Sequence, residues 1–266
     1  MQEANGAMKR MEENSECEAL RDGPPPAMRH ADGPPWHRLR WWTVAGAITF
    51  TVSTAAAFQI DGWCAEHLQP LRLPGDIRKA IHLTEAFAHG FGAGMILLVL
   101  WVAAQGPTRR RVAMAVLITC ASGLAGNLSK ALFVRVRPYA ARNVIVDPGG
   151  GIHLSPPILA APAADRVPPR WTDASIRSFP SGHAATAWGL AIGLSIVAPR
   201  AAALFVLLAI LASMQRLVAH AHYLSDVTAG AALACWVSLI LLRVPTMRRI
   251  LERPPPTRQR ARSPRN

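Results

Sequence analysis

The chain has 266 residues, a formal net charge of +13, and a composition in which 51% of the residues are hydrophobic and 17% are charged. The mean hydropathy of +0.19 excludes an ordinary soluble domain, because the apolar residues gather in runs long enough to cross a bilayer. In a membrane protein, an excess of Arg is typical of cytoplasmic loops and of contact with anionic lipid. The composition therefore predicts a lipid bilayer as a partner, and no nucleic acid.

The first segment of the chain, residues 1–35, is polar and is broken by the Pro-rich stretches GPPP and GPP. This composition predicts a disordered cytoplasmic tail. No apolar core follows the first Met, so we expect no cleavable signal peptide.

Six apolar runs follow this tail, and each predicts a membrane-spanning helix, because a helix satisfies its own backbone hydrogen bonds inside lipid. Together they predict an all-α, polytopic bundle of six transmembrane helices over residues 36–243. Only Pro199 and Arg200 separate the fourth run from the fifth, which predicts a tight helical hairpin with a buried turn. The six runs are 41–59, 85–104, 112–133, 182–198, 201–214 and 224–242.

The basic residues predict which helix ends face the cytoplasm. They gather in residues 29–40, in the loop 106–111 and in the tail 244–266, which we expect to be disordered. All three lie on the inner side of the cell (inner) membrane if both termini are cytoplasmic. The outer side then holds 60–84, 135–180 and 216–223, with 139–177 as an irregular outer cap.

The first outer polar cluster is the stretch KALFVRVRP, from Lys130 to Pro138. Lys130 and Arg137 are seven positions apart, so on a continuous helix both side chains would project from one face. Pro138 would then stop the helix.

Two further clusters lie on the same predicted side of the membrane. In SFPSGHA, Ser181 and Gly182 begin an apolar helix and His183 follows them, so backbone N–H groups and the helix dipole favour an anion there. In QRLVAHAHYLSD, Asp226 follows His222 by four positions and can fix the tautomer of its ring. With Arg216, these residues form a cationic site suited to a phosphoryl group.

These three segments resemble the signature segments of the type 2 phosphatidic acid phosphatase (PAP2) family. The family pattern is Lys, six residues, Arg-Pro; then Pro-Ser-Gly-His; then Ser-Arg, five residues, His, three residues, Asp. The spacings and the order match here, and the resemblance covers residues 100–243, with the first two helices similar in architecture only. Gln215 departs from the pattern, because the family has Ser before the Arg. We expect this residue to make a different contact without inactivating the site.

The resemblance implies a role for each matching residue. His222 would be the nucleophile, Asp226 would orient it, and His183 would protonate the leaving oxygen and later activate water. The phosphate oxygens would be held by Lys130, Arg137, Ser181, Gly182 and Arg216. No metal and no cofactor is needed in this scheme, because side chains supply the positive charge.

The predicted function is therefore an integral membrane lipid phosphatase that acts on a phosphomonoester or diphosphate of a lipid at the outer face. Phosphatidic acid, phosphatidylglycerol phosphate, polyprenyl diphosphate and lipid A phosphates are typical substrates of the family, and the sequence does not choose between them. An alternative is a lipid phosphotransferase that uses the same phosphohistidine intermediate on His222. A vanadate-dependent haloperoxidase has a similar site but is soluble, and a lipid-phosphate transporter or scaffold would not need the His–Asp–His set. The oligomeric state is left open.

Other His residues raise separate hypotheses. His82, Glu85 and His89 are spaced as if on one face at the start of the second helix, which suits a polar rim or a partner of the site better than a metal site. His220, two positions before His222, is interpreted as a residue at the membrane boundary.

Overall fold

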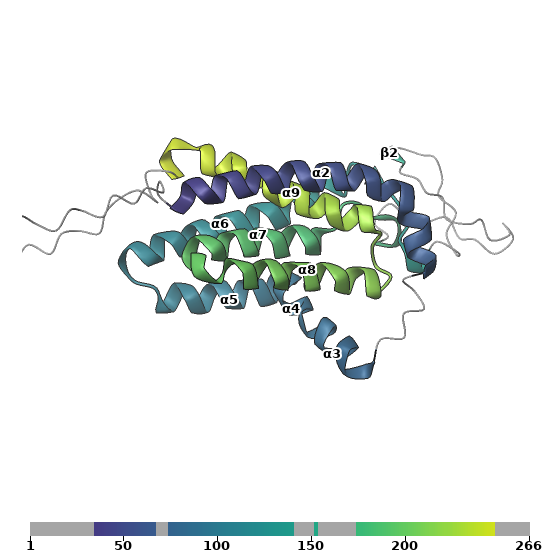
Figure 1. Cartoon of the computed structure of the whole chain (residues 1–266), viewed down its shortest axis with the longest axis horizontal. Coiled ribbons are helices and arrows are strands. Elements are labelled where there is room, and N and C mark those ends of the chain that lie inside the picture. Colours follow the sequence, from purple (N-terminus) through teal and green to yellow (C-terminus); the bar gives the residue numbers. More distant parts are fainter. Residues whose placement is uncertain (1–34, 68–73, 141–151, 154–173, 248–266) are drawn as a thin grey trace, which may run out of the picture. The chain divides into compact units, whose positions relative to one another are not determined.

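The computed structural model describes residues 35–67, 74–140, 152–153 and 174–247, and nearly all of them are helical (Figure 1). The chain divides into two compact units, Met1–Arg38 and Leu39–Asn266, and the helices belong to the second unit apart from the start of the first helix. The predicted tail 1–35, most of the predicted cap 139–177 and most of the predicted tail 244–266 lie outside the described residues.

The helices and strands follow one another with short connections in the described ranges. The α-helices are α2 (Pro35–His67), α3 (Gly75–Leu83), α4 (Glu85–Ala88), α5 (Gly90–Ala103), α6 (Gly106–Ser129), α7 (Gly182–Val197), α8 (Ala202–Val218) and α9 (Leu224–Arg243). The 3-10 turns are η1 (Pro138–Ala140), η3 (Ala174–Ile176) and η4 (Pro199–Ala201). Two short parallel strands, β1 (Phe133–Val134) and β2 (Ile152–His153), pair with each other.

The membrane character of the chain is confirmed by the length and hydropathy of its helices. Within the described residues, four helical stretches are long and apolar enough to span a bilayer, and a fifth is formed if the bent pair of α3–α4 and α5 counts as one span. Helix α7 is apolar but has only 16 residues. The protein is thus an all-α membrane protein, while the number of six crossings remains a prediction.

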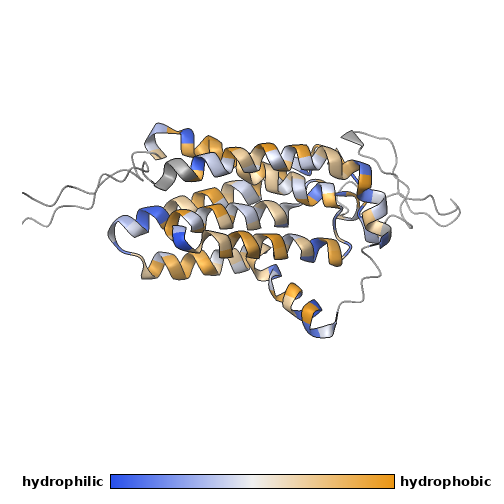
Figure 2. Ribbon diagram, viewed as in Figure 1, coloured by the Kyte–Doolittle hydropathy of each residue, from blue (hydrophilic) through white to orange (hydrophobic). Residues whose placement is uncertain are grey.

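Helix α7 is the centre of the bundle, because most of its side chains are buried on all sides. One apolar cluster packs it against α5, α6 and α8 through residues such as Leu97, Leu190 and Leu194. A second cluster packs its other side against α2, α6 and α9 through residues such as Ile118, Ile192 and Leu239. The outer helices expose large apolar side chains, which is expected where lipid is the solvent. In Figure 2 the ribbons of α5 and α8 are mostly coloured as hydrophobic.

The second predicted span is not one helix, so the prediction that His82, Glu85 and His89 share a helix face is wrong. The chain leaves the α-helical conformation at His89, and the two parts of this span meet at an angle of 67°. The ring Nδ1 of His89 accepts the N–H of Phe91 at 3.3 Å. His89 therefore acts as the N-cap of α5, which satisfies a backbone donor that the helix leaves open.

The hairpin between the fourth and fifth runs is as tight as predicted, because η4 alone joins α7 to α8. Its turn is exposed rather than buried, since Pro199 and Arg200 lie at the surface at the end of the bundle. The same end holds the start of α6 with Arg109, and the C-terminus of α9 (Figure 1). The C-termini of α2, α6 and α8 and the N-termini of α7 and α9 lie at the opposite end.

Candidate active site

The three polar segments meet at this second end of the bundle. The Ser181 N–H donates a hydrogen bond of 2.9 Å to the backbone carbonyl of Asp226, which joins the start of α7 to the start of α9. The Lys130 Nζ lies 3.6 Å from the point where a Cβ on Gly182 would stand, which places the end of α6 beside the same turn. Segments about 50 and 100 positions apart in the chain thus form one site.

His222 lies in the turn between α8 and α9 and is almost fully buried. Its Nδ1 is 3.4 Å from the Asp226 Oδ2 and 3.5 Å from the Ser178 Oγ. Burial lowers the pKa of His222, and the hydrogen bond and the negative charge of Asp226 oppose that shift. With Nδ1 directed at a carboxylate, the ring is left with Nε2 as its reactive nitrogen.

Asp226 is fully buried in the first turn of α9 and is surrounded by donors. Its Oδ2 accepts the backbone N–H of Tyr223 at 2.9 Å and also accepts the hydroxyl of Ser178. Its Oδ1 accepts the guanidinium of Arg135. These bonds fix the carboxylate while Oδ2 faces the ring of His222.

Lys130 and Arg137 do not share a helix, which corrects the prediction from their spacing. Helix α6 ends at Ser129, Lys130 is its C-cap, and Arg177 Nη1 donates to the carbonyl of Lys130 at 2.9 Å. Pro138 therefore does not stop α6, which ends well before it. Burial, together with the charge of Arg137, lowers the pKa of Lys130 to about 8.

The residues after Lys130 are extended because they pair with the segment that precedes α7. The Arg135 N–H donates to the carbonyl of Ile176 at 2.8 Å, and the Arg137 N–H donates to the carbonyl of Ser175 at 2.7 Å. In an extended chain, alternate residues point to the same side, so the period of two brings Arg135 and Arg137 to the site. The side-chain Nε of Arg137 is buried without a hydrogen-bond partner among the described residues.

Ser181 and Gly182 start α7 as predicted, although the Ser181 N–H is already used by Asp226. The Ser181 Oγ accepts the N–H of Ala184 at 3.3 Å, so this side chain caps the helix. A Cβ at Gly182 would stand 2.8 Å from the Asn127 Oδ1, which explains why a residue without a side chain is needed beside α6. Ser181 therefore contributes by joining and capping helices, and Gly182 by allowing their close approach.

His183 lies on the first turn of α7, within electrostatic range of His222, Lys130 and Arg216. Its ring centroid is 5.9 Å from that of His89, at the bend before α5. The two predicted catalytic His residues therefore face one site, His183 from α7 and His222 from the turn between α8 and α9.

Arg216 is nearly buried at the end of α8 and is held by its neighbours. The Glu85 Oε1 accepts its Nη2 at 2.6 Å, and the Oε1 of Gln215 accepts its Nε. The Nε2 of Gln215 lies 3.2 Å from the Nδ1 of His82 and 3.3 Å from the Glu85 Oε2. Gln215, the departure from the family pattern, thus links Arg216 to α3 and α4.

His82 and Glu85 contact Gln215 and Arg216, which matches the hypothesis that they are partners of the site. Among the described residues, no group of three His, Cys, Asp or Glu side chains is arranged to hold a metal ion. His89 instead caps α5, and its ring lies near that of His183 in a tilted arrangement.

Three polar residues of the site were missed by the sequence reasoning. Asp61 on α2 and Arg135 are fully buried and form an ion pair of 2.6 Å, and Ser178 contacts both His222 and Asp226. A lone acid two positions after the first predicted apolar run was the available signal for Asp61, which lies inside the span Leu39–Ala65 of the structure, because an unpaired carboxylate in lipid is costly. The Arg-Val-Arg alternation was the signal for Arg135.

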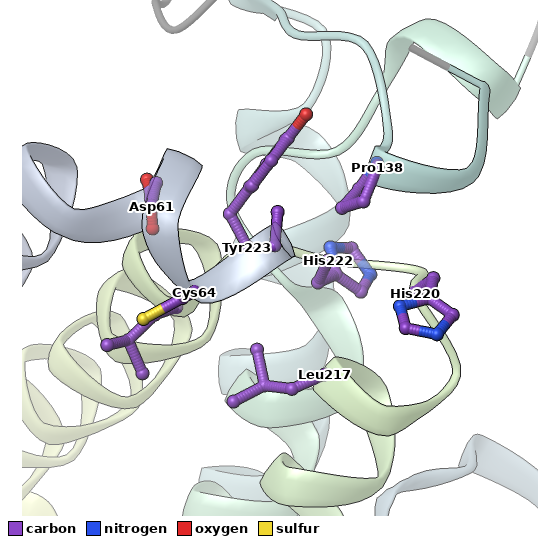
Figure 3. Close-up of a pocket in the computed structure, with 9 residues that line it drawn as sticks. Asp61, Cys64, Pro138, Leu217, His220, His222 and Tyr223 are labelled. Atoms are coloured by element: carbon purple, nitrogen blue, oxygen red, sulfur yellow. The ribbon is translucent and has the colours of Figure 1, made fainter. Parts of the chain in front are cut away.

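A small cavity of about 10 Å³ lies beside His222, on the side of α2. Figure 3 shows Asp61 and Cys64 on one side of it and His222 and His220 on the other. Burial lowers the pKa of His220. The cavity has room for about one water molecule, so the lipid does not bind here.

The arrangement has the parts that phosphoryl transfer needs. An imidazole is oriented by a buried carboxylate, a second imidazole faces the same space, and cations from the first and third segments act on them. Arg and Lys side chains at such a site can hold phosphate oxygens and offset the charge that develops on them.

Comparison with known proteins supports this chemistry. The family model described as the PAP2 superfamily matches residues 111–250, which is more than half of the chain. The chain is also similar to proteins named "Lipid A 1-phosphatase" from Rhizobium etli (40% identity over 67 residues) and Rhizobium johnstonii (39% over 66 residues). Each match covers 25% of this chain and only 29% or 27% of the relative. No solved structure matches. The chain therefore belongs to the PAP2 superfamily, as a membrane-embedded member.

Proposed function

We propose that the protein is an integral membrane phosphatase that removes phosphate from a lipid phosphomonoester or diphosphate through a phosphohistidine. The observation that carries the proposal is the buried pair of His222 and Asp226, with atoms 3.4 Å apart, inside the group of Lys130, Arg137 and Arg216. A histidine with a fixed tautomer inside a cluster of cations is suited to attack a phosphorus atom.

In the first step, the Nε2 of His222 attacks phosphorus, and the bond from phosphorus to the lipid oxygen breaks. The negative charge of the bound phosphate favours the protonated ring of His183, which gives its proton to that oxygen, so the lipid leaves as a neutral alcohol or as a monophosphate. The phosphorylated ring of His222 keeps its proton on Nδ1 and is cationic, and Asp226 faces it. Lys130, Arg137 and Arg216 hold the remaining phosphate oxygens.

In the second step, water attacks the phosphorus and gives a proton to the now neutral His183. The N–P bond breaks, phosphate leaves, and both imidazoles return to their starting states. Because side chains supply the cations, the reaction does not require a metal ion.

The active face is the outer side of the membrane in this proposal. Arg109 and Arg200 lie at the end of the bundle opposite His222 (Figure 1). Basic residues favour the cytoplasmic side, so the site would face away from the cytoplasm. The names of the two relatives favour a lipid whose phosphate is attached to a sugar, as in lipid A.

The test is phosphate release by the purified protein in detergent from a panel of lipid A, phosphatidic acid, phosphatidylglycerol phosphate and a polyprenyl diphosphate. We expect turnover of at least one lipid in the presence of EDTA, and inhibition by vanadate, which adopts the five-coordinate geometry of the transition state. His222→Ala should reduce turnover to background. Ser238→Ala, a buried change on α9 whose hydroxyl donates to the Ala234 carbonyl of its own helix at 2.7 Å, is the matched control and should keep full activity.

Two results would contradict the proposal. One is a wild-type protein that binds these lipids but releases no phosphate and transfers none to a second lipid. The other is activity that EDTA abolishes and that a single divalent metal ion restores.

A further inference from the structure

Arg135 is almost fully buried between α2, the strand β1 and α9, and it contacts two carboxylates. Its Nη2 is 2.6 Å from the Asp61 Oδ2, and its Nη1 donates to the Asp226 Oδ1. The guanidinium also lies against two aromatic rings, at 4.9 Å from that of Phe58 and 4.2 Å from that of Tyr223. Arg135 is thus a bridge between the first helix and the carboxylate that faces His222.

Asp61 is held as firmly as Asp226. Its Oδ1 accepts the backbone N–H of Ser225 at 3.0 Å, and its Oδ2 accepts the Ser225 hydroxyl. The same hydroxyl oxygen accepts Arg135 Nη1 at 2.6 Å. The side chains of Asp61 and Asp226 are both fully buried, so water screens neither charge.

The charges in this cluster do not cancel. Arg135 alone would neutralise Asp226, and a neutral pair is the less costly arrangement inside a protein. Asp61 adds a second buried carboxylate, so the three described side chains of Arg135, Asp61 and Asp226 carry a net charge of −1. Packing does not require this excess charge, but a histidine that becomes a phosphorylated cation does benefit from it.

We propose that Asp61 is a positioning residue that acts through Arg135 to keep Asp226 negatively charged toward His222. The negative charge of Asp61 offsets part of the positive charge of Arg135. Arg135 therefore weakens the electrostatic attraction between Asp226 and the imidazole of His222 less than it would alone. The first helix therefore contributes to the active site, although it lies outside the matched residues 111–250. The inference rests on the proposed role of His222 as the nucleophile.

Several other groups act on His222 and stay constant in the test. Lys130 and Arg137 lower its pKa by their positive charge, and Asp226 raises it. His183 faces it from α7, and His220 lines the cavity beside it in the same turn.

The first test measures the titration of His222 by NMR on histidine-labelled protein in micelles, with the signal assigned from a His222→Gln sample. Asp61→Asn removes one negative charge and should move the pKa of His222 down by about 0.5 unit or more, because a negative charge near an imidazole favours its protonated form. The double variant Asp61→Asn with Arg135→Met returns the net charge of the cluster to −1. It should bring the pKa back toward the wild-type value.

The matched control is Thr54→Val. The Thr54 Oγ1 donates to the Thr228 Oγ1 at 3.0 Å, so this change also removes a polar contact between α2 and α9, but it removes no charge. It should leave the titration of His222 unchanged. If Asp61→Asn does not fold, Ser225→Ala weakens the contact of Asp61 with Arg135 and should shift the pKa in the same direction by less.

The second test is the pH profile of kcat/KM on whichever lipid the wild-type protein hydrolyses. His222 must be neutral to attack, so Asp61→Asn, which lowers the pKa of His222, should move the acid limb of the profile to lower pH. The phosphorylated, cationic ring of His222 also loses the support of a negative charge, so kcat should fall about 10-fold or more, with a small change in KM. A titration of His222 that is unchanged in Asp61→Asn, or shifted equally in Thr54→Val, would overturn the inference. Failure of the proposed function would appear instead as an inactive wild-type protein, and the NMR titration would still decide the role of Asp61.

Discussion

Gln215 is the residue at which this chain departs from the family pattern, and its contacts differ from those that a Ser could make. Its amide reaches both His82 and Glu85, while its oxygen accepts the Nε of Arg216. A Ser at this position is too short to reach α3 and α4. Gln215 therefore connects Arg216 to α3 and α4, a connection that a Ser could not make.

Gln215→Ser should weaken substrate binding more than it slows chemistry. The loss of hydrogen bonds worth about 1 kcal/mol each predicts a KM about 5-fold higher, with kcat within about 2-fold of wild type. Steady-state kinetics on the best lipid of the panel measure both constants. An unchanged KM, or a fall in kcat of about 100-fold, would show that Gln215 does not act by orienting Arg216.

Lys130 predicts a basic limb in the pH profile. Its pKa is lowered to about 8 by burial and by Arg137, so the ammonium loses its proton as the pH rises through about 8. The charge that binds phosphate is present below that pH and absent above it. We expect kcat/KM of the wild type to fall more steeply above about pH 8, and Lys130→Arg to lack this additional fall, because Arg stays protonated, whereas any loss of the proton of His183 is common to both proteins. An identical fall in both proteins would assign the limb to another group.

The sequence predicted that the eight residues of the three motifs lie at one end of the bundle, because the motifs are local and their spacing is visible in one dimension; their roles in the site stay a prediction. It did not predict Asp61 and Arg135, because a buried ion pair between residues 74 positions apart leaves no local spacing. Nor did it predict what Glu85 contacts, since this depended on where the helix breaks.

At the scale of the helices, the site depends on how closely α7 and α9 approach. A Cβ at Gly230 would stand 2.4 Å from the carbonyl oxygen of Ser181, so only Gly allows the present contact. That contact lies beside the hydrogen bond from Ser181 to Asp226. The close approach of α7 and α9 therefore keeps Ser181 and Gly182, at the start of α7, next to the third motif at the start of α9.

Gly230→Ala should move the start of α7 away from α9. We expect the melting temperature to fall, by an amount equivalent to about 1–3 kcal/mol, and the activity of the folded fraction to fall further, because the His183 ring moves with α7. The control is Gly94→Ala, since nothing lies within 4 Å of its added Cβ. The control should be as stable as wild type or slightly more stable, with full activity. Equal activity of the two folded variants would contradict this account.

Helix ends were the least predictable elements. The spacing of Lys130 and Arg137 suited one helix, but the pairing of Arg135 and Arg137 with residues 175–176 favours an extended chain there. Likewise, nothing in the hydropathy of residues 85–104 marks the break at His89, which arises because the His ring caps α5. The runs that became α7 and α9 were predicted closely, since their apolar stretches are bounded by Gly182 and Leu224.

At the scale of the whole molecule, the account predicts an orientation in the membrane. The basic end of the bundle should face the cytoplasm and the end with His222 should face outward. A reporter that is active only in the cytoplasm, fused after Arg258, should be active, and the same reporter inserted in the range 154–173 should be inactive. The reverse pattern would place the site on the cytoplasmic face.

The central claim is that His222 carries the phosphoryl group during turnover. The most direct measurement is to mix the purified protein with a lipid whose phosphate is radiolabelled, to quench within one turnover, and to map the labelled residue by mass spectrometry. The account predicts a phosphate on His222 that is labile in acid and stable in base, that accumulates when His183→Ala slows its hydrolysis, and that is absent from His222→Ala. Label that persists in His222→Ala, or full turnover by that variant, would contradict it.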